Sequence, residues 1–201
     1  MRPSNTQLFR LIVSLAVAIP LTAVAHPGIE HVTGFMQGVI HPFTGIDHML
    51  AMVAVGLMAG RLGGRATWLV PASFMTLMAV GAILGMTGVA VPFVEIGIAT
   101  SILVFGLLLA SGRDLSLLAT MALVGFFALF HGHAHGSEAA TDIAGVSYEM
   151  GLLAATAVLH AAGVVAAMAV INWNRATAAP LLRWSGRLVA LGGVCVLTGW
   201  L

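Results

Sequence analysis

Three ionisable side chains lie close together in an otherwise apolar stretch near the start of the sequence. His41 is followed, after five intervening residues, by the adjacent pair Asp47 and His48. If this stretch crosses a membrane, an Asp at its centre costs about 2.5 to 3.5 kcal/mol, so such residues are rare where they have no function. Imidazole nitrogen and carboxylate oxygen suit Ni²⁺, Co²⁺ and Zn²⁺. The three residues are therefore candidate ligands of a divalent transition-metal ion.

A second cluster of histidines lies further along the chain. His131, His135 and Glu138 stand at positions i, i+4 and i+7, which places them on one stripe of an α-helix. His133 would point about 200° away from His131 on the same helix, which makes it the weaker candidate ligand. Glu95 is an isolated carboxylate in a third apolar stretch and is a further candidate. The predicted metal site thus draws on three separate segments.

The composition indicates what kind of element must hold these residues. Of the 201 residues, 60% are hydrophobic and 7% are charged, whereas an ordinary soluble domain has about 25% charged residues. The apolar residues form long blocks separated by short polar segments, which is typical of several membrane-spanning helices. A net charge of +1 offers no basic patch for nucleic acid, and the single Cys195 excludes a disulfide framework or a CxxC metal site.

The apolar blocks predict an all-α, polytopic bundle of six transmembrane helices. Their expected ranges are 33–61, 66–88, 92–111, 115–135, 148–171 and 183–201. The first range is too long for a straight span, because about 29 residues of helix measure roughly 44 Å against a hydrocarbon thickness of about 30 Å. Pro42 and Gly45 predict a break of this helix beside His41 and Asp47. Transporters commonly build ion sites at such breaks.

Residues 1–25 have the pattern of a secretory signal peptide. Two arginines precede an apolar run, and Ala23-Val24-Ala25 forms a small-residue cleavage site before His26. The alternative is an uncleaved first membrane helix, but the run is shorter than the roughly 20 residues that a span requires. We expect residues 26–201 to form a single six-helix transmembrane transport domain.

The distribution of arginine predicts the orientation of this domain in a bacterial inner membrane. With the mature N-terminus in the periplasm, all eight basic residues fall on the cytoplasmic side, as the positive-inside rule requires, and the C-terminus is periplasmic. Two of the eight lie in the signal peptide. The others follow the first, third and fifth helices and are Arg61, Arg65, Arg113, Arg175, Arg183 and Arg187. An outer connection that contains Glu138, Asp142 and Glu149 would attract cations.

The two histidine clusters resemble the signature motifs of the HupE/UreJ family of nickel and cobalt permeases. The matching segments are His41-Pro-Phe-Thr-Gly-Ile-Asp47-His48-Met-Leu-Ala-Met52 and Phe130-His131-Gly-His-Ala-His135-Gly-Ser-Glu138. The resemblance covers the whole chain and implies uptake of nickel for hydrogenase or urease, or of cobalt for cobalamin synthesis. It implies functional positions at His41, Asp47, His48, Glu95, His135 and Glu138. Phe74 resembles an aromatic position of the family, with core packing as the alternative.

These observations together predict an inner-membrane permease that passes Ni²⁺ or Co²⁺ into the cytoplasm. The transported ion and the lipid bilayer are the expected partners, and we expect no cofactor beyond that ion. The sequence has no nucleotide-binding motif of the form GxxxxGKS/T, so transport without ATP is expected. A membrane potential could drive it at about 2.3 kcal/mol per charge per 100 mV. Nickel and cobalt have overlapping ligand preferences, and both remain candidates.

Two other functions would use the same residue types. A membrane-embedded zinc metallohydrolase would hold one tightly bound zinc that activates water. A haem-binding electron-transfer subunit would use paired histidines. The outlying residues also have two interpretations each. His160 is either a stepping stone for the ion or an interhelical hydrogen-bonding group. Glu149 either serves the entry path or ends a helix, and His26 and His31 either collect metal or have no function.

Overall fold

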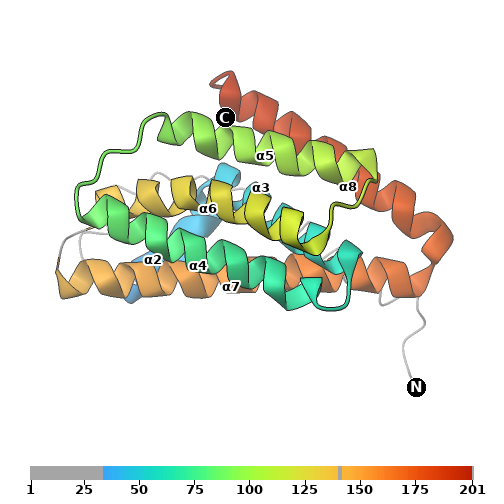
Figure 1. The fold of residues 1–201 in the computed structure, drawn as a ribbon, viewed down its shortest axis with the longest axis horizontal. Coiled ribbons are helices and arrows are strands. Elements are labelled where there is room, and N and C mark those ends of the chain that lie inside the picture. Colours follow the sequence, from blue (N-terminus) through green and yellow to red (C-terminus); the bar gives the residue numbers. More distant parts are fainter. Residues whose placement is uncertain (1–33, 140–141, 201) are drawn as a thin grey trace. The chain divides into compact units, whose positions relative to one another are not determined.

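The computed structural model describes residues 34–139 and 142–200, all within one compact unit, His31–Leu201. The expected signal peptide, residues 1–25, lies outside the described residues, as do His26 and His31. The described part of the chain contains helices and no strand, which confirms the all-α prediction. Its seven helices, labelled in Figure 1, are α2 (Phe35–Thr44), α3 (Ile46–Leu62), α4 (Ala66–Met86), α5 (Val94–Ser111), α6 (Leu117–Glu138), α7 (Ile143–Trp173) and α8 (Arg175–Leu197).

The lengths and compositions of these helices are those of a membrane protein. Five of them, α4 to α8, are each long and apolar enough to cross a bilayer. Helices α2 and α3 pass the same test only when they are taken together, and their axes differ in direction by 87°. The chain is therefore a multi-pass membrane protein.

The bend between α2 and α3 lies at Gly45. Its backbone is extended (φ −95°, ψ 112°), and a Cβ atom there would lie 2.8 Å from the Asp47 carboxylate oxygen Oδ1. Pro42 is buried inside α2, which ends two residues later. The Thr44 hydroxyl donates to the His41 carbonyl at 2.7 Å and so satisfies an acceptor at the end of α2. The bend places Asp47 in the first turn of α3, where the helix dipole favours a carboxylate.

Close contacts between helix backbones hold the bundle together. Figure 1 shows that α4 lies along α6 and α5 along α8, while α2 and α3 both pack on α7. At Gly132 in α6 a Cβ atom would overlap the Met78 carbonyl oxygen of α4. At Gly38 in α2 it would overlap the Tyr148 carbonyl oxygen of α7. Glycine at these two positions lets α6 and α2 lie directly against their neighbours.

The predicted boundary between the fourth and fifth helices was wrong. Helix α6 continues to Glu138 instead of ending at 135, and α7 begins at Ile143 instead of 148. The early start of α7 has a physical cause, since Asp142 caps it. The Asp142 Oδ1 accepts hydrogen bonds from the backbone N–H groups of Ala144 at 2.9 Å and Gly145 at 3.2 Å.

The predicted connection between the fifth and sixth helices was also wrong. Helix α7 extends to Trp173 and α8 begins at Arg175 instead of 183, so a single residue, Asn174, separates them. The Asn174 Oδ1 accepts from the backbone N–H of Ala176 at 2.9 Å and caps α8. Arg183, which was expected in this connection, is therefore part of α8, and Arg187 is too.

The two ends of the helix bundle differ in charge. Helices α3, α5 and α7 end, and α4, α6 and α8 begin, at an end that we call the arginine end. It carries Arg61, Arg65, Arg113 and Arg175, and a pocket there is lined by Arg61, Gly112, Ile171 and Arg175 among others. We call the opposite end the histidine end. Among the described residues, it carries every carboxylate except that of Asp114, namely Asp47, Glu95, Glu138, Asp142 and Glu149.

Candidate metal-binding site

Four imidazole rings from three helices meet near the histidine end, and we call them the four-histidine cluster. They belong to His41 in α2, His48 in α3, and His131 and His135 in α6. The ring centre of His48 lies 4.4 Å from that of His135 and 4.9 Å from that of His131. His41 lies 4.8 Å from His135 and 6.3 Å from His48. The structure thus brings the two histidine-containing segments of the sequence together.

Asp47 orients the ring of His48. Its Oδ1 atom lies 3.1 Å from the His48 Nδ1 atom. A proton on Nδ1 would be donated to this carboxylate, which leaves the lone pair on Nε2 free. The Nε2 atom is buried and has no hydrogen-bond partner. A carboxylate behind an imidazole in this way is the usual support of a metal-binding histidine.

A serine from α5 supports His131 in a similar way. The Ser101 hydroxyl donates to the Ile98 carbonyl at 2.6 Å, so its oxygen is free to accept a proton from the His131 Nε2 atom, 2.9 Å away. The neutral ring then has its lone pair on Nδ1, which is buried without a partner. His131 is 0% exposed. Ser101 was not predicted from the sequence, where it is one serine among many apolar residues.

Among the described residues, no hydrogen-bond partner lies beside either ring nitrogen of His135. Its ring is 2% exposed, and both Nδ1 and Nε2 are buried without a hydrogen bond. An unsatisfied buried polar group costs about 1 to 3 kcal/mol, and the great majority of such groups in proteins are paired. The neutral ring of His135 has one lone pair, and together with those on His48 Nε2 and His131 Nδ1 it forms a set of buried lone pairs that a cation could satisfy.

The rings are not arranged as a closed metal cage. Within the described residues, no three His, Cys, Asp or Glu side chains form a complete metal-binding group. The rings of His48 and His131 are nearly perpendicular, at 89°, as are those of His41 and His135, at 87°. Binding of one ion by several of these histidines would therefore require the rings to rotate.

The remaining predicted ligands, Glu95 and Glu138, line two pockets at the histidine end. One, of about 340 Å³, is lined by His41, Glu138 and Tyr148 among others. The other, of about 510 Å³, is lined by Asp47 and Glu95 among others. Glu95 and Glu138 are exposed. Each pocket thus pairs an exposed glutamate with a more deeply placed residue of the site.

The other ionisable side chains near this end have different surroundings. The His133 Nε2 atom lies 2.7 Å from the Val89 carbonyl oxygen, to which it can donate, so this ring belongs to the connection between α4 and α5. The Tyr148 ring lies 5.8 Å from that of His41, a contact that the sequence did not predict. Glu149 is buried in α7, and neither carboxylate oxygen has a hydrogen-bond partner.

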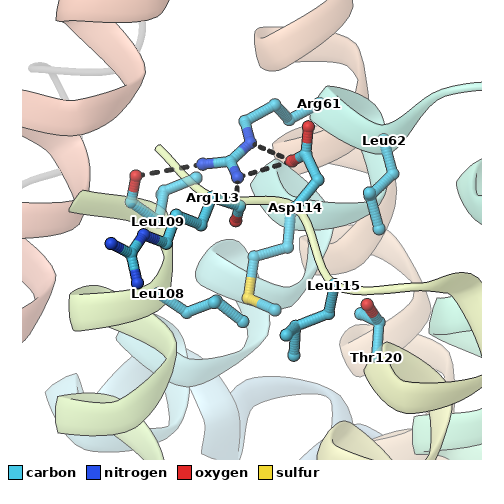
Figure 2. Close-up of a pocket in the computed structure, with 9 residues that line it drawn as sticks. Arg61, Leu62, Leu108, Leu109, Arg113, Asp114, Leu115 and Thr120 are labelled. Carbon is cyan, nitrogen blue, oxygen red and sulfur yellow. Dashed lines mark hydrogen bonds and ion pairs between the residues drawn. The ribbon is translucent and has the colours of Figure 1, made fainter. Parts of the chain in front are cut away.

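A further pocket lies at the arginine end, and none of the predicted ligands lines it. Figure 2 shows the Arg61 guanidinium among the side chains that line it. Arg61 donates to the Asp114 Oδ1 from Nε at 2.8 Å and to the Leu109 carbonyl from Nη1 at 3.0 Å, and its Nη2 atom contacts the Arg113 carbonyl. These bonds satisfy backbone carbonyls at and after the end of α5. The same bonds tie the end of α3 to the end of α5 and the segment after it.

Comparisons with known proteins match a range of the chain that contains both histidine-rich segments. The chain matches the family model described as HupE / UreJ protein over residues 13–196, a range that includes every candidate ligand. It is also similar to Protein HupE of Rhizobium leguminosarum bv. viciae, with 43% identity over 184 residues, which cover 92% of this chain and 94% of that protein. No solved structure matches the chain.

Proposed function

Because the chain belongs to the HupE/UreJ family, which is associated with nickel and cobalt transport, we propose that it is a permease that carries Ni²⁺ or Co²⁺ into the cytoplasm. The observation that carries this proposal is the set of buried, unpartnered imidazole nitrogens in the four-histidine cluster. Imidazole with carboxylate and no thiolate is the ligand type that these ions accept. The proposed ligands are His41, Asp47, His48, Glu95, His131, His135 and Glu138.

The two glutamate-lined pockets support an entry route for the ion. In this proposal Glu95 and Glu138 attract a hydrated cation to the mouths of the pockets, since exposed carboxylates raise the local cation concentration. The ion then exchanges some of its water for His41 and for Asp47, which line the same two pockets. Binding at the cluster must remain moderate, because a site that conducts an ion must also release it.

The charge difference between the two ends supports an orientation in the membrane. We propose that the arginine end faces the cytoplasm, in agreement with the positive-inside rule. Helices α2 and α3 then form one broken span, which makes six spans in a single domain over residues 26–201, preceded by a cleaved signal peptide over 1–25. Both ends of the mature chain would be periplasmic in a bacterial inner membrane.

The driving force proposed for transport is the membrane potential. A divalent cation that enters a negatively charged cytoplasm gains about 2.3 kcal/mol per charge for each 100 mV. The alternative of a membrane-embedded zinc metallohydrolase has no support from the comparisons, which match a transporter family. That enzyme would retain one tightly bound zinc per chain, whereas a permease exchanges its ion.

Uptake of ⁶³Ni²⁺ and ⁵⁷Co²⁺ by cells that express the protein tests this function. Wild-type cells should accumulate at least one ion, and Asp47→Asn should abolish accumulation, because the neutral amide neither orients His48 as a carboxylate does nor attracts a cation. Asp142→Asn is the matched control, since Asp142 lies at the same end and its capping role is retained by an amide. Equal uptake in cells with and without the protein, at verified expression, would refute the proposal.

A further inference from the structure

His160 lies near the middle of the 31-residue helix α7, away from the proposed ligands. His160 is 1% exposed, and within the part of the chain that the structure describes neither ring nitrogen has a hydrogen-bond partner. Of the two interpretations of His160, the interhelical hydrogen bond is therefore not formed with any described residue. A leucine or phenylalanine would fill such a position without leaving a buried polar group unpaired. Packing does not account for a histidine here.

The ring of Phe74 joins His160 to the four-histidine cluster. Phe74 is fully buried, and its ring centre lies 5.6 Å from that of His131 and 5.1 Å from that of His160. His131 in turn lies 4.9 Å from His48. The rings therefore form a continuous series that leads from the cluster into the middle of the bundle.

Toward the arginine end, α7 continues after His160 with apolar residues only, from 161 to 171. One helical turn toward the histidine end, the Thr156 hydroxyl contacts the Met78 sulfur at 3.9 Å, and both residues are fully buried. On the α3 side, Gly56 packs directly against the His160 carbonyl oxygen. Within the described residues, the other buried ionisable side chains lie at the four-histidine cluster or nearer to the histidine end. His160 is thus the last buried imidazole on the way to the arginine end.

We propose that His160 is a second binding station for the transported divalent transition-metal ion, reached from the four-histidine cluster past the ring of Phe74. This inference rests on the proposed transport function. An imidazole nitrogen is a suitable ligand for Ni²⁺ or Co²⁺, and the face of an aromatic ring attracts a cation that passes it. An apolar ring between two polar stations also interrupts a continuous file of water. The ion then crosses in two steps instead of through an open pore.

Uptake by proteoliposomes that contain the purified full-length protein tests the station. His160→Ala should lower the initial rate of ⁶³Ni²⁺ uptake by about tenfold or more, which corresponds to about 1.4 kcal/mol in the barrier. Ni²⁺ should still raise the melting temperature of the purified His160→Ala protein, as it should for wild type, because the four-histidine cluster is intact. Leu159→Ala removes a neighbouring buried side chain, and this control should retain most of the uptake rate.

A cysteine at position 160 tests direct contact with the metal. His160→Cys should give an ultraviolet thiolate-to-metal absorption band when Cd²⁺ is added, and wild type, which has only Cys195, serves as the baseline. If His160→Ala does not fold, the cadmium absorption of His160→Cys still tests whether residue 160 contacts the metal. Wild-type uptake in His160→Ala, or the absence of the cadmium band in a folded His160→Cys, would overturn the inference. Failure of wild type itself to transport would instead refute the proposed function.

Discussion

The imidazole rings of His48 and His135 lie 4.4 Å apart, centre to centre, although they come from the separate helices α3 and α6. His48 Nε2 and both His135 nitrogens are buried, and none of them has a hydrogen-bond partner among the described residues. No hydrogen bond joins these two rings among the described residues, and a cation held between them would satisfy a lone pair on each ring. The predictions below depend on this relationship.

Binding of Ni²⁺ or Co²⁺ should raise the melting temperature of the purified protein. At a metal concentration of about 100 times Kd, a ligand that binds only the folded state adds about 2.7 kcal/mol, which raises the melting temperature of a chain of this size by several degrees. Thermal unfolding followed by circular dichroism measures this shift. His135→Ala should reduce it strongly, and an equal shift in wild type and His135→Ala would show that the metal binds elsewhere.

Replacement of His133 should leave metal uptake largely intact. Its ring hydrogen-bonds the Val89 carbonyl and is not part of the cluster, so His133→Ala removes about 1 kcal/mol of stability at the connection between α4 and α5. Hydrogen exchange of residues 87–93 should become faster while ⁶³Ni²⁺ uptake is retained. Loss of uptake in a folded His133→Ala protein would mean that this imidazole also carries the ion.

A methyl group at position 132, on the contact between α6 and α4, should displace the four-histidine cluster. Its Cβ would overlap the Met78 carbonyl oxygen, so Gly132→Ala must push α6 away from α4 and displace the neighbouring His131. We expect a lower melting temperature and reduced uptake. Gly125→Ala, on the same helix, is the matched control, because its nearest neighbour is the Ser73 Oγ at 3.1 Å, a side-chain atom. Similar effects of the two variants would argue against close packing at Gly132 as the cause.

Arg61 should matter more for stability than its ion-pair partner. Asp114 has 57% of its side chain exposed, so Asp114→Asn should change the free energy of unfolding by less than about 1 kcal/mol. Arg61→Ala also removes the donor to the Arg113 carbonyl and one of two donors to the Leu109 carbonyl, which keeps the Gly112 N–H, and should destabilise more. Arg61→Lys should rescue only partly, because an ammonium does not reproduce the guanidinium fork. Thermal unfolding compares the three variants, and equal losses in Asp114→Asn and Arg61→Ala would contradict this ranking.

Part of the site could be predicted because it depends on local helical geometry. The i, i+4 spacing places His131 and His135 on one stripe of α6, and His133 points elsewhere, as expected from the same spacing. Asp47 and His48 are neighbours in the chain, so their contact needs no knowledge of the fold. These relationships follow from residues within two turns of one helix.

The rest depends on how the helices are placed relative to one another. Ser101 bonds its own backbone at Ile98, as most serines in apolar helices do, and its contact with His131 requires the alignment of α5 with α6. The early starts of α7 and α8 depend on the caps Asp142 and Asn174, which an apolar pattern does not reveal. A single sequence contains no direct signal for the alignment of α5 with α6, whereas Asp and Asn are residue types that mark a helix start and could have indicated the two caps.

Uptake by proteoliposomes that contain only the purified protein tests the central claim most directly. With an inside-negative potential imposed, wild-type vesicles should accumulate ⁶³Ni²⁺ or ⁵⁷Co²⁺ well above protein-free vesicles, without ATP. Vesicles with His135→Ala at the same protein content should not. If wild-type vesicles take up no more of either ion than protein-free vesicles, or if His135→Ala transports as well as wild type, the four-histidine cluster is not the route of a metal permease.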